Sequence, residues 1–119
     1  MKALALAVLV AALVVPSALA KDRTIASYCS ESGDVCTAIH DRGGVVYLQI
    51  VTYTLYFKRY QLCVRGPKSK VCHTFPISKS GQNYASTINW SKNFPNQGKG
   101  VYKVTWQYSA KTLSFRLPL

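Results

Sequence analysis

The sequence predicts an all-β fold, an antiparallel sandwich of seven or eight strands, and three observations carry this prediction. Strand-forming residues (Val, Ile, Thr, Tyr, Phe and Trp) dominate the chain after residue 20. The same part of the chain lacks the apolar period of 3.6 residues that marks an amphipathic helix. Turn-forming clusters of Gly, Pro, Ser, Asn and Asp divide it into short segments, a spacing typical of sandwiches and barrels.

The first 20 residues are typical of a leader that is removed during export. Lys2 supplies a positive charge, residues 3–15 are apolar and uncharged, and Ala18 and Ala20 match the small-residue rule for signal peptidase. Thirteen helical residues rise about 20 Å, which is too short for a hydrocarbon core of about 30 Å. We therefore expect a signal peptide over 1–20, one secreted domain over 21–119, and no transmembrane segment after cleavage.

The exported part divides into eight segments with strand character, separated by turn signals. The third is apolar on both faces, so it is expected either to expose aromatic side chains or to pack beneath another hairpin. We expect essentially no helix. The expected strands are 24–30, 34–40, 45–57, 59–65, 70–77, 84–91, 100–108 and 111–117.

All four cysteines lie in the exported part, and an even count in an exported chain favours two disulfides. Three connectivities are possible. We favour pairing neighbours in sequence, because each such pair is symmetric about a turn, at residues 32–33 or 67–68. A zinc site is the alternative, but six and eight intervening residues do not match the usual two to four. The expected disulfides are Cys29–Cys36 and Cys63–Cys72, the second on the outer face of its hairpin.

The last two segments alternate apolar and polar residues, as strands with one buried face do. A hairpin centred on residues 109–110 places all of their apolar side chains on one face. The expected cross-strand pairs in this register are Tyr102 with Leu117, Val104 with Phe115, and Trp106 with Leu113.

The stretch 94–104, Phe-Pro-Asn-Gln-Gly-Lys-Gly-Val-Tyr-Lys-Val, resembles the approach to the penultimate strand of immunoglobulin-like and fibronectin-III-like domains. Residues 113–115 resemble the last strand of those domains. The resemblance implies an Ig-like sandwich in which Tyr102 forms a corner hydrogen bond to the backbone. The opening stretch 28–36 is similar to small exported proteins of high-GC Gram-positive bacteria, a resemblance that implies no activity.

Charge is distributed unevenly along the chain. Removal of Lys2 with the leader leaves 14 of the 15 basic residues against 4 acidic ones, a net charge of +10. All four acidic residues precede residue 42, and twelve basic residues follow from Arg42 onward. Such a field favours polyanions such as teichoic acid, nucleic acid, anionic lipid or sulfated sugar. The alternative is that the charge provides only solubility and weak non-specific binding.

Two surfaces are candidates for binding. In the expected last hairpin, Lys103 and Arg116 lie directly opposite each other on the outer face. Arg65 joins them if its strand neighbours this hairpin, as in Ig folds, which predicts an anion-binding surface of three residues. Tyr47 and Tyr53 share one parity of the third segment and could form an aromatic face for a sugar or a protein partner.

Catalysis is not expected, because the sequence offers no recognisable nucleophile, phosphate loop or paired carboxylates. The two histidines do not change this: His40 adjoins Asp41 but points to the opposite strand face, and His73 has the parity of a core residue. No metal or cofactor is expected either. The predicted function is a secreted, non-enzymatic basic binding module for an anionic cell-envelope or extracellular partner. The alternatives are a carbohydrate or protein adhesion module that uses exposed tyrosines, and a small secreted inhibitor or toxin.

Overall fold

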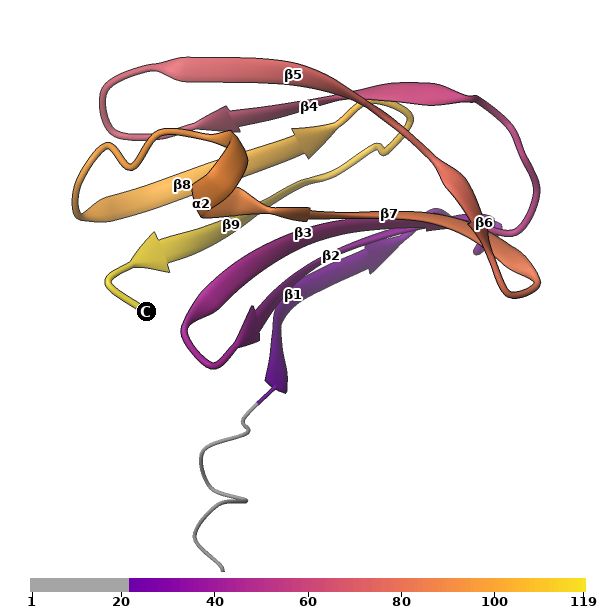
Figure 1. The fold of residues 1–119 in the computed structure, drawn as a ribbon, viewed down its shortest axis with the longest axis horizontal. Helices are drawn as coiled ribbons and strands as arrows, with labels where there is room; N and C mark the ends of the chain where they lie inside the picture. Colours follow the sequence, from indigo (N-terminus) through magenta and orange to yellow (C-terminus); the bar gives the residue numbers. More distant parts are fainter. Residues whose placement is uncertain (1–21) are drawn as a thin grey trace, which may run out of the picture.

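The computed structural model describes residues 22–119, so the expected leader and Lys21 lie outside the described residues. Two antiparallel sheets pack face to face (Figure 1). The five-stranded sheet has the order β1 (Asp22–Cys29), β2 (Val35–Arg42), β3 (Val45–Thr52), β7 (Asn83–Asn89) and β6 (Ser78–Ser80). The four-stranded sheet has the order β5 (Lys70–Pro76), β4 (Arg59–Arg65), β8 (Gly100–Trp106) and β9 (Thr112–Leu117), and a short helix, α2 (Trp90–Asn93), connects β7 to β8.

The strand order is that of an Ig-like sandwich. With β1 set aside, β2-β3-β7-β6 corresponds to the four-stranded sheet of constant-type domains, and β4-β8-β9 corresponds to the three-stranded sheet. β5 adds an edge strand to the second sheet, as in variable-type domains. The expected fold class is therefore confirmed. The structure differs in three details: β3 ends at Thr52, β6 is an additional short strand, and α2 follows β7 where a longer strand was expected.

The core forms where the inner faces of the two sheets meet. On β3, Val46, Leu48 and Ile50 are buried, while the alternate residues are only half-buried, as the strand period of two requires. Trp106, on the inner face of β8, is fully buried. Helix α2 adds Trp90, whose ring packs edge-on against Tyr102 and Phe115 with centroid distances of 5.2 and 5.3 Å. Both tryptophans of the chain therefore belong to the core.

Both expected disulfides are present, and each joins residues directly opposite each other in a hairpin. Cys29 pairs with Cys36 across β1 and β2, and Cys63 pairs with Cys72 across β4 and β5. The Cα atoms of the two pairs are 4.0 and 4.1 Å apart. Neither disulfide belongs to the core cluster, so each fastens a hairpin from its outer face.

The expected register of the last hairpin is wrong by two residues. The structure pairs Tyr102 with Phe115 and Val104 with Leu113. The loop between the strands begins with a turn in which the Ser109 amide donates to the Trp106 carbonyl at 3.1 Å, so the hairpin closes earlier than expected. Because side chains alternate with a period of two, a shift by two residues keeps every apolar side chain on the same face.

His73 is exposed, and its expected place in the core is wrong. It has the parity of a core residue, but β5 is the edge strand of its sheet and has a neighbouring strand on one side only within residues 22–119. Its ring centroid lies 5.1 Å from that of Phe94, which makes it part of the rim of the core. Parity alone therefore identifies the face of a strand but does not establish burial at an edge.

Tyr60 gives the fold a measurable pH dependence. Its hydroxyl on β4 donates to Ser86 Oγ on β7 at 2.8 Å and so joins the two sheets. Burial raises the pKa of Tyr60 above its usual value near 10, and the hydrogen bond to Ser86 offsets part of this rise. The folded state therefore holds the phenolic proton more tightly than the unfolded state does. The resulting stability is fully present below about pH 10 and is lost as the pH rises above it.

We therefore expect the free energy of unfolding to fall as the pH rises above about 10, and to fall less in Tyr60→Phe. Urea unfolding of both proteins at a series of pH values measures this difference. Tyr84→Phe is the matched control, since Tyr84 is a half-buried tyrosine on β7. A decline of equal size in all three proteins would show that Tyr60 is not responsible.

Candidate anion-binding surface

The outer face of the four-stranded sheet carries a row of cationic residues on three neighbouring strands. Arg65, at the end of β4, lies directly opposite Lys70 on β5 and directly opposite Lys103 on β8. Neighbouring strands are about 4.8 Å apart, so the three Cα atoms fall within about 10 Å. We call Lys70, Arg65 and Lys103 the basic row. All three side chains are exposed.

A small hollow of about 190 Å³ lies against the basic row. Its remaining lining comes from Cys63, Thr105 and Thr112, and the two threonine hydroxyls are 2.9 Å apart. This space corresponds to about six water molecules, which is enough for a phosphate or sulfate group. Cationic side chains and hydroxyl donors around one hollow are the groups that bind such anions.

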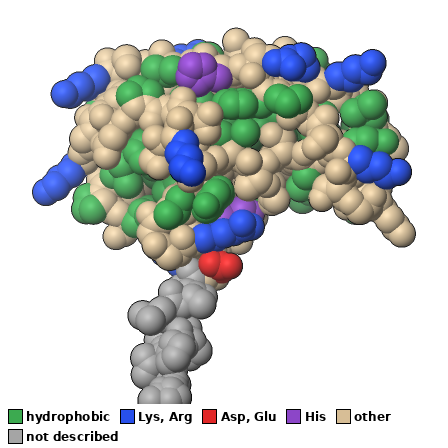
Figure 2. All heavy atoms as spheres, viewed as in Figure 1, with side chains coloured by type: hydrophobic (Ala, Val, Ile, Leu, Met, Phe, Trp, Pro, Cys, Tyr) green, Lys and Arg blue, Asp and Glu red, His purple; other side chains and the backbone are tan. Residues whose placement is uncertain are grey.

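Within the described part of the chain, the basic row has no acidic partner. Within residues 22–119, the ion pair of the structure joins Arg23 Nε to Asp41 Oδ2 at 3.1 Å, on β1 and β2 of the other sheet. Like charges directly opposite each other on neighbouring strands are destabilising, by up to about 1 kcal/mol for each pair. Figure 2 shows basic side chains spread around the visible face, with an acidic side chain near the start of β1. The row is therefore a concentration of charge that only a bound anion or dissolved counterions can offset.

Arg116 does not occupy the place expected for it. The corrected register puts it opposite Val101, while Lys103 faces Ser114. Arg116 is therefore a diagonal neighbour of Lys103, about 7–8 Å away, and it does not line the hollow. The structure brings Arg65 and Lys103 together as expected. It replaces Arg116 with Lys70, which the expected surface did not include, although the symmetry that pairs Cys63 with Cys72 also pairs Arg65 with Lys70.

The turn between β4 and β5 is held in place by Gln97. Its side-chain oxygen accepts hydrogen bonds from the amides of Lys68 and Ser69 at 2.8 and 2.7 Å. Its backbone amide donates to the Tyr102 hydroxyl at 2.8 Å, and that hydroxyl donates to the Gly98 carbonyl at 2.6 Å. This is the corner hydrogen bond that the Ig-like resemblance implies for Tyr102. A buried core tyrosine thus fixes the turn between Arg65 and Lys70 of the basic row.

Gln97→Ala is expected to loosen this turn without altering any charge. Two backbone amides lose their partner, which we expect to lower the free energy of unfolding by about 1–2 kcal/mol. Affinity for a polyanion should fall about threefold, because Lys70 and Arg65 become less well ordered. Urea unfolding and a binding titration measure the two effects. Gln61→Ala, on the same face but away from the turn, serves as the control and should leave binding unchanged.

The two tyrosines expected to form an aromatic face lie far apart. Tyr47 is half-buried on the outer face of β3, where the Arg42 guanidinium carbon lies 5.2 Å from its ring centroid. Tyr53 follows the end of β3 and is 59% exposed. Six residues of strand span about 20 Å, so a single sugar ring cannot contact both.

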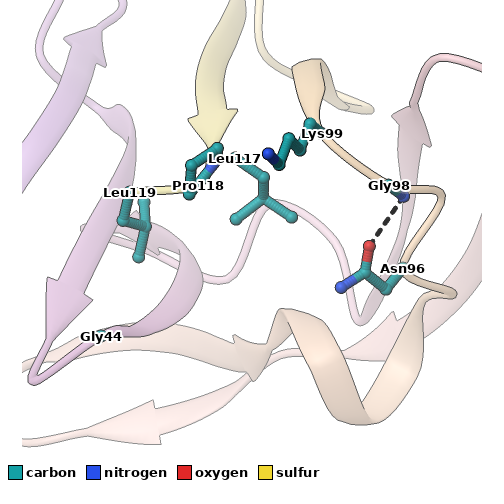
Figure 3. Close-up of a pocket in the computed structure, with 7 residues that line it drawn as sticks. All are labelled: Gly44, Asn96, Gly98, Lys99, Leu117, Pro118 and Leu119. Carbon is teal, nitrogen blue, oxygen red and sulfur yellow. Dashed lines mark hydrogen bonds between the residues drawn. The ribbon is translucent and has the colours of Figure 1, made fainter.

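A second hollow, of about 430 Å³, opens beside the C-terminal residues (Figure 3). Leu117, Pro118 and Leu119 form its apolar side, and Lys99 contributes a charged group. Asn96 accepts a hydrogen bond from the Gly98 amide at 2.8 Å, which shapes the loop before β8. This loop leads into the strand that carries Lys103, so Lys99 adds a further cation at the same end of the sandwich.

His40 and Asp41, which are neighbours in sequence, both make structural contacts. The ring nitrogens of His40 contact Thr24 Oγ1 at 3.2 Å and Gln49 Oε1 at 3.0 Å, on the outer face of the sheet. Asp41 points inward to Arg23. Within residues 22–119, no group of three or more potential metal ligands gathers. Nor does this part of the chain contain a helix long and apolar enough to cross a membrane.

Together these observations define a disulfide-bonded, Ig-like β-sandwich with a basic face. In comparisons with protein-family models, curated proteins and solved structures, nothing matches the chain. Function is therefore inferred from the fold and from the chemistry of its surface.

Proposed function

We propose that the protein is a secreted, non-enzymatic binding module whose basic row binds an anionic polymer of the cell envelope or the extracellular medium. One observation carries this proposal: Lys70, Arg65 and Lys103 lie side by side on three strands, without an acidic partner in residues 22–119. The leader over residues 1–20 and the two disulfides support export, because disulfides persist in oxidising compartments.

Binding would proceed through charge neutralisation. A phosphate or sulfate group in the hollow would accept hydrogen bonds from Arg65 in the centre, whose planar guanidinium can donate two in parallel. Lys70 and Lys103 would supply point charges on either side, and the hydroxyls of Thr105 and Thr112 would add neutral donors. Each neutralised phosphate or sulfate releases counterions, so affinity depends steeply on salt.

The rest of the chain supports attraction over a longer range. From Arg42 to the end of the sequence there are twelve basic residues and no acidic one. Clefts and faces of one sign raise the local concentration of oppositely charged ligands and speed their association. The diffuse charge would bring the polymer to the protein, and the basic row would hold one stretch of it.

Affinity measured across a salt series tests the proposal. The probe is inorganic polyphosphate, with a sulfated polysaccharide as a second polyanion, titrated into oxidised protein of residues 21–119. Three contacts at the row predict that the logarithm of affinity falls with the logarithm of salt concentration with a slope of about −2 to −3. Absence of binding at low salt would reduce the charge of this protein to a solubility feature.

A further inference from the structure

Exposed apolar side chains gather at the end of the sandwich opposite the basic row. Tyr53, Leu55 and Tyr56 come from the loop between β3 and β4, and their exposed fractions are 59%, 45% and 54%. Tyr108, from the loop between β8 and β9, is 54% exposed. Single exposed apolar side chains need no explanation, but a group of them at one end of a small domain points to a binding surface, and within this group Tyr56 and Tyr108 line a common hollow.

Tyr108 is held with one face of its ring turned outward. Its φ of 77° makes it the non-glycine residue with a positive φ in the described part of the chain. This conformation is costly for a bulky side chain, and such strain clusters at functional sites. The ring stacks on Phe57 with a centroid distance of 4.2 Å and an interplanar angle of 8°. Phe57 is buried, so the pair presents a rigid aromatic platform whose outer surface is Tyr108.

A polar rim faces this platform across a hollow of about 340 Å³. The rim is the turn between β1 and β2, which the Cys29–Cys36 disulfide closes. Ser30 and Ser32 each accept a hydrogen bond from a backbone amide of this turn, at 3.2 and 3.3 Å, which orients their hydroxyls. The aromatic side of the same hollow consists of Tyr56, Phe57 and Tyr108.

Asp34 brings an unpaired charge into the hollow. Its side chain is half-buried, and within residues 22–119 its carboxylate has neither a hydrogen-bond partner nor an ion pair. A carboxylate accepts up to four hydrogen bonds, so it remains free to accept them from a ligand. The hollow therefore combines a flat apolar surface on one side with an acceptor and two hydroxyls on the other.

We propose that this hollow binds one or two rings of a neutral saccharide. A sugar ring has an apolar C–H face that packs on an aromatic ring, and hydroxyls at its edge that donate to a carboxylate. Tyr108 would supply the stacking surface, and Asp34 would accept the hydroxyl protons in hydrogen bonds. A volume at the lower end of the range for ligand sites, about 300–1,000 Å³, suits a ligand of this size.

Charge favours a neutral ligand over a cationic one. An aromatic platform beside a carboxylate could also receive a cation, but the domain after residue 20 has a net charge of +10, which opposes the approach of cations. A neutral sugar is indifferent to this field. The site is separate from the basic row and does not depend on the polyanion function.

The test is binding of oxidised protein, residues 21–119, to a broad array of neutral glycans in about 1 M NaCl, where the screening length is about 3 Å. Screening removes the contribution of the basic row, so failure of the polyanion proposal and failure of this one are distinguishable. A glycan that binds is then titrated in solution, with an expected Kd of about 1 mM or tighter. No binding to any glycan of the array would overturn the proposal.

Two variants locate the site. Tyr108→Gly removes the ring and suits the positive φ, and it should weaken binding about tenfold or more. Asp34→Asn keeps the shape of the side chain and should weaken binding by about fivefold. The control, Tyr53→Ala, removes an exposed ring that does not line this hollow, and it should bind as the unmodified protein does. Unchanged affinity in Tyr108→Gly would contradict the assignment. A Tyr108→Gly variant that loses self-association and not sugar binding would contradict it as well.

Discussion

Replacing the basic row with glutamine (Lys70→Gln, Arg65→Gln and Lys103→Gln together) is expected to reduce affinity for polyphosphate about 100-fold at low salt. Each cation near an anionic surface contributes about 1 kcal/mol, and 1.4 kcal/mol corresponds to a factor of ten. The salt dependence should weaken as well, because three fewer contacts release fewer counterions. Isothermal titration of both proteins at several salt concentrations measures the affinity and its slope.

Stability provides an internal control for this variant. Removing like charges that lie directly opposite one another should leave the free energy of unfolding unchanged or raise it, by up to about 1 kcal/mol for each of the two pairs. The loss of binding could then not be attributed to misfolding. A second variant of equal net charge, with Lys58, Lys79 and Lys92 replaced by glutamine, removes three exposed cations elsewhere. If it loses as much affinity as the first variant, binding depends on total charge and the row has no special part.

Removal of the disulfide beneath the row, by Cys63→Ala with Cys72→Ala, is expected to lower the free energy of unfolding by about 2–3 kcal/mol. The crosslink closes a short loop, with a sequence separation of 9, and so restricts the unfolded chain. For a domain of this size the loss corresponds to a fall in Tm of about 10–20 °C. Thermal unfolding followed by circular dichroism measures it.

The other disulfide offers a matched comparison. Cys29→Ala with Cys36→Ala opens a loop of similar length, with a sequence separation of 7, at the far end of the other sheet. Both double variants should lose similar stability. At a temperature where both are folded, only the Cys63 and Cys72 variant should also lose polyanion affinity, because Cys63 lines the hollow. If the two double variants bind the polyanion with equal affinity, the Cys63–Cys72 disulfide has no part in the binding surface.

Local symmetry in the sequence predicted both disulfides, and it also implies the pairing of Arg65 with Lys70, although the expected anion-binding surface did not include Lys70. The turn at residues 67–68 pairs Cys63 with Cys72, and both Cα distances fit a crosslink between directly opposed residues. Extending the same symmetry by two residues pairs Arg65 with Lys70. The partnership of Arg65 with Lys103 followed from the Ig-like resemblance and is present in the structure.

The register of the last hairpin could not be predicted from its alternation. A slip by one residue exposes the core side chains, but a slip by two keeps every side chain on its face. The outcome depends on the loop, where Tyr108 takes a positive φ and stacks on Phe57, a contact distant in sequence. The resulting shift moved Arg116 away from its expected place opposite Lys103.

Edges and loops limited the remaining predictions for similar reasons. His73 has the parity of a core residue, yet it is exposed because β5 is an edge strand, which depends on the order of strands in the sheet. The hollow near Asp34 and Tyr108 combines two loops that are distant in sequence. Because these loops come together only in the folded protein, no periodic pattern in the sequence predicts the hollow.

The most direct test of the polyanion function is to map where a short polyanion binds. Oxidised protein of residues 21–119, labelled with ¹⁵N, is titrated with a short polyphosphate while backbone amide shifts are followed by NMR. The proposed function predicts that the largest changes fall on residues 63–72 and 101–105, around the basic row. Changes concentrated on β1 and β2, or spread evenly over all exposed lysines, would contradict it.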